Sequence, residues 1–213
     1  RFAALKLKSK GLKKLIIDLR NNGGGVLTGA TQIADEFLKA EIPIVATKGE
    51  HSEKYTYKST VQGLLKDIDV AILINANSAS ASEILAGAIQ DNDRGVIIGR
   101  RSFGKGLVQE DVLLRDGSNL RLTIARYYTP TGRCIQKEYT DDLETYYDDQ
   151  NDRYENGEMY EIDSSLFVNS KKFTTPGGKV VYGGGGIMPD IFVPFDSVGI
   201  TSYYRELRYS DAF

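Results

Sequence analysis

The chain has very little of two residue types on which many catalytic and metal sites depend. It contains a single cysteine, Cys134, and a single histidine, His51, among 213 residues. One cysteine excludes an internal disulfide and a zinc site built from several cysteines. The one histidine lies in the polar stretch 50–54, which argues against a Ser-His-Asp catalytic triad. We interpret Cys134 as a packing residue and His51 as a solvated loop residue.

Long apolar runs and a large net charge are also missing. No apolar run approaches the roughly 18 residues of a transmembrane helix. A formal net charge of −2 gives no reason to expect a nucleic acid or an anionic membrane surface as partner. The length suggests one domain, at most two. The chain begins at Arg1 rather than Met, so we expect it to be a piece of a longer protein.

Short apolar strands alternate with helical patterns through the first half of the chain. The expected elements are a helix end closed at Gly11, a strand over 13–20, a helix over 26–40, a strand over 43–47, a polar loop over 48–66, a strand over 69–75, a helix over 82–91 and a strand over 95–99. This alternation predicts an α/β fold with a largely parallel sheet.

The pattern changes in the second half. Residues 107–114 and 119–128 alternate apolar and polar around Asp116-Gly117, which predicts an antiparallel hairpin, and regular structure resumes at 179–182. Between Glu138 and Asp163, eleven acidic residues and five tyrosines accompany one basic residue, Arg153. This composition favours a solvated insertion packed by its tyrosines, and the alternative is a surface that meets a partner or substrate.

Three serines alternate with alanines where an apolar strand leads into a helix, at Ser78, Ser80 and Ser82. The stretch from Ser80 to Glu83 is a capping box, which by itself indicates an ordinary helix N-cap. A helix N-terminus also offers free N–H groups and a positive dipole end. These suit a serine whose carbonyl adduct becomes an oxyanion. Ser80 is therefore our candidate nucleophile.

Lys105 is the candidate base, because serine hydrolases also use a Ser-Lys variant. A lysine in that role must be neutral near pH 7, and burial can lower a lysine pKa by the roughly 2–3 units required. Lys105 lies between two glycines and near Phe103, Leu107 and Val108. Gln109, four residues further on, could hold the amine in place.

Two glycine-containing motifs allow other interpretations. Gly99-x4-Gly104-Lys105 is a near miss to the phosphate-binding loop, but Gly106 lacks the hydroxyl that binds magnesium. A strand rather than a helix is also expected to follow, which argues against a nucleotide site. The run Asn22 to Gly25 fits either a tight strand-to-helix turn or a source of an N–H donor for an oxyanion, and the sequence leaves both open.

Five motifs together resemble the carboxyl-terminal processing peptidases, also called tail-specific proteases. They occur in the family's order and cover most of the chain: IIDLRNNGGG (16–25), NSASASEILAGAIQD (77–91), GRRSFGKGLVQ (99–109), YYTPTGRCIQ (127–136) and GGIMPDI (185–191). The resemblance implies a serine endopeptidase that cleaves proteins near their C-termini. The implied fold is an α/β core related to crotonase and Clp protease, with a mostly parallel sheet and a C-terminal β-rich part.

Carried over residue by residue, the resemblance implies that Ser80 is the nucleophile, Lys105 the general base and Gln109 the residue that orients it. The N–H groups of Gly25 and Ala81 would form the oxyanion hole. No metal or organic cofactor and no nucleic acid is implied, and the expected partners are proteins or peptides with unstructured C-termini. The resemblance allows a homo-oligomer and implies the periplasm or cell envelope of a bacterium.

We divide the chain into a catalytic core (1–136 and 179–195), an acidic, tyrosine-rich insertion (137–178) and a C-terminal extension (196–213). The family usually carries a PDZ domain before this core, so we expect one in the full-length protein. We also expect residues to be missing near Ala3-Ala4, where the family has a longer segment.

The family pattern has an acidic residue near Arg100, and its replacement by Arg100-Arg101 could alter substrate preference. Two other functions stay open. One is a catalytically silent homologue that binds peptides or acts as a scaffold, although intact Ser80, Lys105 and Gln109 favour a peptidase. The other is an acyl-CoA enzyme of the crotonase fold, which gives no reason for Lys105 and Gln109.

Overall fold

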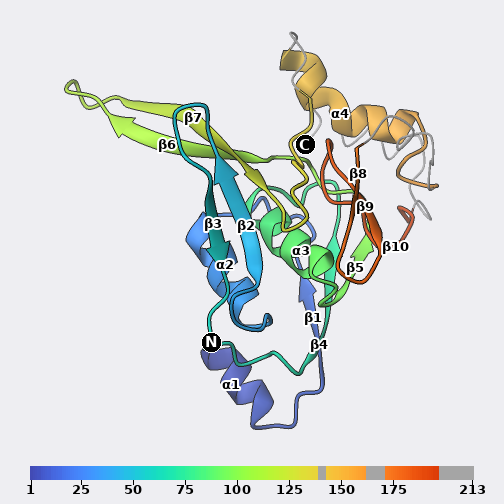
Figure 1. Cartoon of the computed structure of the whole chain (residues 1–213). Coiled ribbons are helices and arrows are strands. Elements are labelled where there is room, and N and C mark those ends of the chain that lie inside the picture. The colour runs from blue at the N-terminus through green and yellow to red at the C-terminus, as the bar shows by residue number, and fades with distance from the viewer. Residues whose placement is uncertain (139–142, 162–170, 197–213) are drawn as a thin grey trace.

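The computed structural model of the chain describes residues 1–138, 143–161 and 171–196. Figure 1 shows its elements, which in chain order are α1 (Phe2–Lys8), β1 (Lys14–Asp18), α2 (Leu27–Asp35), β2 (Pro43–Lys48), β3 (Tyr55–Lys58), β4 (Asp69–Ile74), α3 (Ala81–Asp91), β5 (Val96–Gly99), β6 (Leu107–Leu113), β7 (Asn119–Tyr128), α4 (Leu143–Glu155), β8 (Lys172–Thr174), β9 (Val180–Tyr182) and β10 (Ile191–Phe192). Within these ranges no helix is both long enough and apolar enough to cross a membrane.

A parallel sheet with strand order β1-β4-β5-β10 forms one layer of the molecule. All of its strand pairs are parallel, with Ile17 opposite Ile72 and Ile72 opposite Ile97. Parallel neighbours require crossover connections, and the chain between β1 and β4 passes through α2, β2 and β3. The predicted α/β fold with a parallel sheet is confirmed.

A second, antiparallel sheet has the order β3-β2-β7-β6. Its strands β6 and β7 form the predicted hairpin, which turns at Gly117 and projects beyond the body of the molecule (Figure 1). Among the described residues, β6 pairs with β7 alone in this sheet, so its other edge has no strand partner there.

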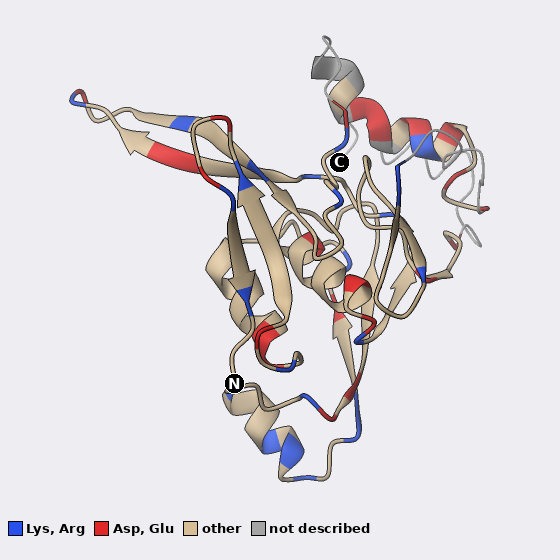
Figure 2. Cartoon of the chain, viewed as in Figure 1, with Lys and Arg blue, Asp and Glu red and all other residues tan. Residues whose placement is uncertain are grey.

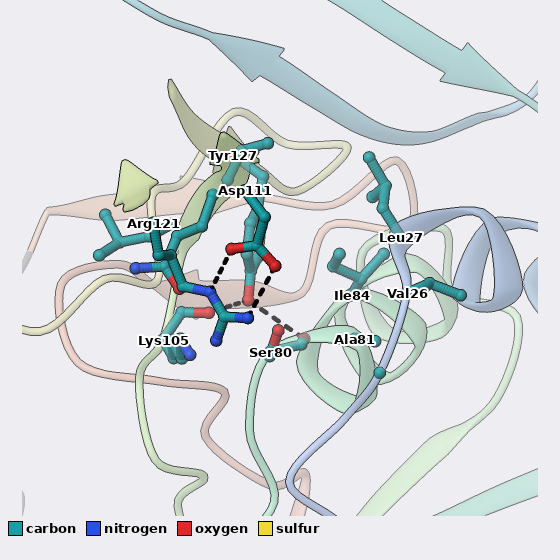
Figure 3. Close-up of a pocket in the computed structure, with 13 residues that line it drawn as sticks. Val26, Leu27, Ser80, Ala81, Ile84, Lys105, Asp111, Arg121 and Tyr127 are labelled. Atoms are coloured by element: carbon teal, nitrogen blue, oxygen red, sulfur yellow. Dashed lines mark hydrogen bonds and ion pairs between the residues drawn. The ribbon is translucent and has the colours of Figure 1, made fainter. Parts of the chain in front are cut away.

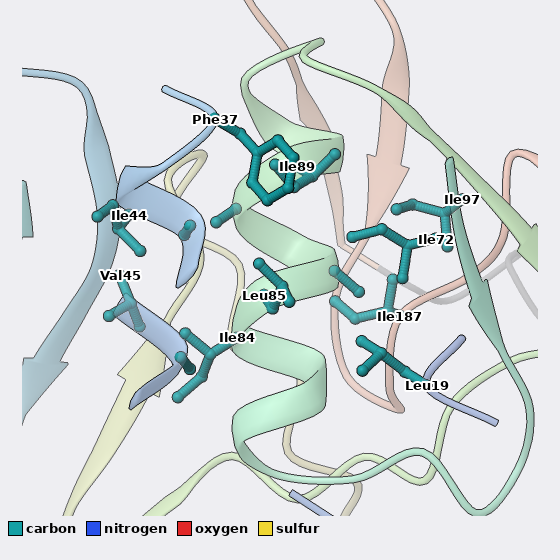
Figure 4. Close-up of a cluster of buried hydrophobic side chains, with 14 of the residues drawn as sticks. Leu19, Phe37, Ile44, Val45, Ile72, Ile84, Leu85, Ile89, Ile97 and Ile187 are labelled. Carbon is teal, nitrogen blue, oxygen red and sulfur yellow. The ribbon is translucent and has the colours of Figure 1, made fainter. Parts of the chain in front are cut away.

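Helix α3 lies between the two sheets and is buried along its whole length. Figure 4 shows Ile44 and Val45 of β2 on one side of the helix and Ile72 and Ile97 of the parallel sheet on the other. Small and apolar residues make up most of its sequence ASEILAGAIQD, as a helix covered on all sides requires. Its buried polar residues are tolerated because they are hydrogen-bonded, as Glu83 is to the Ser80 N–H and Asp91 to Arg133. Burying each large apolar side chain contributes roughly 1.5–3 kcal/mol. The core therefore fixes α3, and with it the serine at its start.

Three local predictions differ from the structure. The predicted loop over 48–66 contains β3, whose four residues pair with β2. The helix predicted over 26–40 ends at Asp35, and Phe37 enters the core from the turn that follows. Strand β8 lies in the predicted insertion and pairs with β9. Such short elements form because a neighbouring strand or the core completes them, which local pattern does not reveal.

Helix α4 lies in the segment that we interpreted as a solvated insertion. Acidic residues line the helix (Figure 2), but Arg153 near its end is only 1% exposed. Its guanidinium donates to the carbonyl oxygens of Arg101 (3.3 Å) and Ser102 (3.0 Å). The Tyr146 ring is buried and lies 4.1 Å from the Lys137 amine. The described part of the segment thus packs on the residues before Lys105, while 139–142 and 162–170 lie outside the described residues. The domain boundaries stay a prediction.

Substituting one buried and one exposed isoleucine on neighbouring strands tests this layering. Ile72 is fully buried and Ile16 is 66% exposed. We expect Ile72→Ala to lower the free energy of unfolding by roughly 2–5 kcal/mol through a core cavity. Ile16→Ala should change it by less than about 0.5 kcal/mol. Chemical denaturation measures both, and equal losses would contradict the layered core.

Candidate active site

A cavity of about 400 Å³ collects residues from separate stretches of the chain. Its lining consists of Gly25, Val26, Leu27, Ser80, Ala81, Ile84, Lys105, Leu107, Val108, Gln109, Asp111, Arg121 and Tyr127. Figure 3 shows Ser80 at the start of α3, with Lys105 and Tyr127 in the same wall. All five residues predicted from the sequence to form the site line this cavity.

The structure gives the three alternating serines different surroundings. The buried Ser78 hydroxyl donates to the Leu19 carbonyl oxygen at 2.7 Å. The buried Ser82 hydroxyl donates to the Asn22 carbonyl oxygen at 3.0 Å. Ser80 lines the cavity instead, with backbone angles of φ 56° and ψ −117°. This conformation is strained for a residue with a Cβ, and such strain is frequent at active sites.

The glycine run after β1 packs directly against this serine turn. A Cβ at Gly24, where φ is +98°, would lie 2.5 Å from the Ala79 carbonyl oxygen and 2.7 Å from the Ala81 nitrogen. The Ala79 N–H also donates to the Asn22 carbonyl oxygen at 3.1 Å. The close approach therefore requires glycine, and it places the Gly25 and Ala81 amides in one wall. In the part of the chain that the structure describes, neither amide donates to another residue.

Glu83 connects the serine turn to the lysine loop. Its fully buried carboxylate accepts from the N–H groups of Ser80 (2.8 Å), Gly104 (2.7 Å) and Lys105 (2.8 Å). The Ser102 hydroxyl donates to the same group at 2.5 Å. Burial raises the pKa of Glu83, and these four donors act in the opposite direction. The sequence indicated only the capping bond to Ser80, and it missed the bonds across to the lysine loop.

Tyr127 of β7 makes a second connection between Ser80 and Lys105 that sequence reasoning missed. Its hydroxyl lies 3.1 Å from the Ser80 carbonyl oxygen and within hydrogen-bond distance of the Lys105 carbonyl oxygen. Burial, followed by the charge of Glu83, raises the pKa of Tyr127 well above its usual value. The hydroxyl therefore keeps its single proton, which is shared between the backbone carbonyl oxygens of Ser80 and Lys105. Its place in the motif YYTPTGRCIQ was the available signal.

Lys105 lies just before β6 and Gln109 lies on it, so both line the cavity from the start of the hairpin. Lys105 is half-buried and Gln109 is exposed. The Gln109 amide donates to the Thr123 hydroxyl at 3.4 Å. Among the described residues, no hydrogen bond joins the Lys105 amine to Ser80 or Gln109. The structure thus places the predicted residues together without a formed proton-transfer contact, as free enzymes often do.

The site can support acyl transfer, because Ser80 with its strained backbone, Lys105 and the residues Gly25 and Ala81 line one cavity. Nothing in the described residues assembles three or more His, Cys, Asp or Glu side chains that could hold a metal ion. His51 is exposed and lies outside the cavity lining, in agreement with our interpretation of it as a solvated residue.

Replacing Glu83 with glutamine tests its connecting role. The amide nitrogen that Glu83→Gln introduces cannot accept a hydrogen bond, so two of the four donors lose their partner. We expect the free energy of unfolding to fall by roughly 2–6 kcal/mol, since each of the two unsatisfied buried donors costs about 1–3 kcal/mol. The matched change Glu110→Gln, at an exposed position of β6, should cost less than about 0.5 kcal/mol. Equal denaturation midpoints for the two variants would contradict the role.

Comparison with known sequences supports the resemblance. The chain is 45% identical over 133 residues to the carboxy-terminal-processing protease of Bartonella bacilliformis. This alignment covers 62% of this chain and 30% of that protein. It is 40% identical over 134 residues to the probable CtpA-like serine protease of Staphylococcus aureus, with 62% of this chain and 27% of that protein covered. The chain therefore spans less than a third of the length of these relatives.

Comparison with solved structures also points to proteases of this kind. The photosystem II D1 C-terminal processing protease matches with a TM-score of 0.62 at 26% identity, over 97% of this chain and 42% of that chain. A lipoprotein from Streptococcus agalactiae matches with a TM-score of 0.52 at 17% identity, over 95% and 58% of the two chains, and shares the fold alone. The family model described as Peptidase family S41 matches residues 2–145. With more than half of its length matched, this chain belongs to peptidase family S41.

Proposed function

We propose that this chain is the catalytic core of a serine endopeptidase that uses Ser80 as nucleophile and Lys105 as general base. The observation that carries the proposal is that one cavity holds both side chains together with the Gly25 and Ala81 amides. These groups come from three separate stretches of sequence. The family membership and the names of the relatives support a peptidase.

In the first step, the neutral Lys105 amine takes the Ser80 hydroxyl proton while the oxygen attacks the peptide carbonyl. The N–H groups of Gly25 and Ala81 hold the oxyanion, and such a donor supplies roughly 3–4 kcal/mol. The Lys105 ammonium then returns the proton to the leaving amine. Water attacks the acyl-enzyme in the second half, with Lys105 again as base.

The substrate enters in an extended conformation and adds a strand to an exposed sheet edge, for which β6 is the candidate. Backbone pairing at an edge is largely independent of sequence, so it suits unstructured tails. Cleavage near the C-termini of proteins follows the names of the relatives. As part of the same proposal, the full-length protein carries a PDZ domain and resides in the bacterial cell envelope.

A catalytically silent peptide-binding homologue is the second candidate. The observation in its favour is that no hydrogen bond joins the Lys105 amine to Ser80 among the described residues. A silent protein would retain the cavity and the sheet edge but would not cleave. Activity therefore decides between the two.

The deciding experiment is cleavage of an unstructured protein, β-casein, by the longest native polypeptide that contains this chain. We expect Ser80→Ala and Lys105→Ala each to lower the cleavage rate by at least about a thousandfold. Wild-type cleavage should rise with pH between about pH 6 and 10, because only a neutral amine can accept the serine proton.

The matched control is Lys172→Ala, which removes an exposed lysine on β8. It should retain wild-type activity, and thermal melting should show that all three variants fold. Near-normal cleavage by Lys105→Ala at neutral pH would remove lysine from the role of base. Binding of β-casein without cleavage by the wild-type protein would favour the silent homologue.

A further inference from the structure

Asp111 and Arg121 form an ion pair that lines the same cavity, on the hairpin that also carries Gln109 (Figure 3). The Arg121 guanidinium donates to both carboxylate oxygens of Asp111, through Nε at 2.7 Å and Nη2 at 2.9 Å. Its two side chains remain 64% and 45% exposed. Apart from Lys105, these are the charged side chains that the described residues contribute to the lining.

The hairpin register places this pair relative to the proposed chemistry. Gln109 lies opposite Thr123, and Asp111 lies opposite Arg121 two residues further out on β6. Residues two apart on a strand share a face and are separated by roughly 7 Å. An extended substrate advances about 3.3 Å per residue. A substrate that pairs along β6 with its scissile bond level with Gln109 therefore brings the side chain about two residues away level with the pair.

Arg121 retains the capacity to bind a further group. A guanidinium carries five N–H donors, and Asp111 takes two of them. In the described part of the chain, the other three have no acceptor. The Asp111 carboxylate is more fully engaged, because both of its oxygens accept from Arg121 and the Arg121 hydrogen bonds lower its pKa. The free capacity of the pair is thus that of a donor, which suits an acceptor on the substrate.

Exchange of partners at this position should be easy. An exposed ion pair contributes little to stability, because water and salt screen both charges. A substrate carboxylate can first use the unoccupied donors and then replace Asp111 in the same two-pronged geometry. Val26, Leu27 and Ile84 give the cavity an apolar wall for the stem of such a side chain.

We propose that Arg121 determines specificity by binding a carboxylate of the substrate within about two residues of the scissile bond, and that Asp111 occupies the guanidinium until substrate arrives. The carboxylate is either an acidic side chain or the free C-terminus of the substrate. This inference rests on the proposed peptidase function of the same cavity.

The test compares peptides that differ only in one carboxylate. One series carries Glu or Gln at each of the two positions on either side of the cleaved bond. A second series ends in a free carboxylate or an amide within the same distance. For each pair, kcat/KM of the acid is divided by kcat/KM of its neutral partner, using the longest native polypeptide that contains this chain.

We expect a ratio above one for at least one pair, and its position identifies which carboxylate is bound. Arg121→Gln should lower that ratio about tenfold, the effect of one lost charge-assisted hydrogen bond. Asp111→Asn should raise the ratio, because it removes the competing carboxylate. Arg115→Gln is the matched control, since this exposed arginine lies at the hairpin turn outside the cavity lining and should leave the ratio unchanged.

An unchanged ratio in Arg121→Gln, or a lowered ratio in Asp111→Asn, would overturn the inference while cleavage itself upheld the peptidase. If the wild-type protein cleaves no peptide, the proposed function fails instead. In that case, fluorescence anisotropy measures the affinity of the labelled peptides for the Ser80→Ala variant, with and without Arg121→Gln. Equal affinity of Ser80→Ala for acidic and neutral peptides would reject the role of Arg121.

Discussion

The hydrogen bonds of the Glu83 carboxylate fix the distance between the two halves of the site. A buried carboxylate is stable only when donors replace its lost water. Here those donors come from the serine turn on one side and from the lysine loop on the other. The four bonds satisfy the carboxylate only when both segments are in place. The requirement to solvate one buried group therefore forces two loops, well separated in sequence, into a single arrangement.

Later parts of the chain complete the support of the lysine loop. The Gln136 side-chain oxygen accepts from the Gly106 N–H at 2.8 Å. The Ile187 carbonyl oxygen accepts from the Ser102 N–H at 3.0 Å. Arg153 of α4 covers the carbonyl groups just before Phe103. Three of the recognisable sequence motifs thus meet at one loop, which explains why they are found together in one sequence although they are far apart along the chain.

The sequence predicted those features that depend on local pattern. Alternation of strands and helices predicted the parallel sheet, and alternation of serines at a helix start made Ser80 a candidate nucleophile. Both signals can be read from short stretches of sequence. It could not predict that the capping Glu83 reaches a second loop, since that bond depends on how β4 and β5 lie side by side. The burial of Arg153 was hidden for the same reason. Besides Asp149 on its own helix, its partners are carbonyl groups of a distant loop, which belong to no side-chain pattern. The sequence also did not predict the pairing of Arg121 with Asp111, because that pairing depends on which residues of the two hairpin strands lie opposite each other.

The backbone at Ser80 has a consequence for how a protein of this fold can change over time. Its φ of 56° belongs to a region where glycine is relaxed and other residues carry about 1–3 kcal/mol of strain. Glycine is also an acceptable N-cap, only a few tenths of a kcal/mol worse than serine. A lineage under selection for stability alone would therefore drift toward glycine here. Serine at this position therefore costs folding stability that glycine would not.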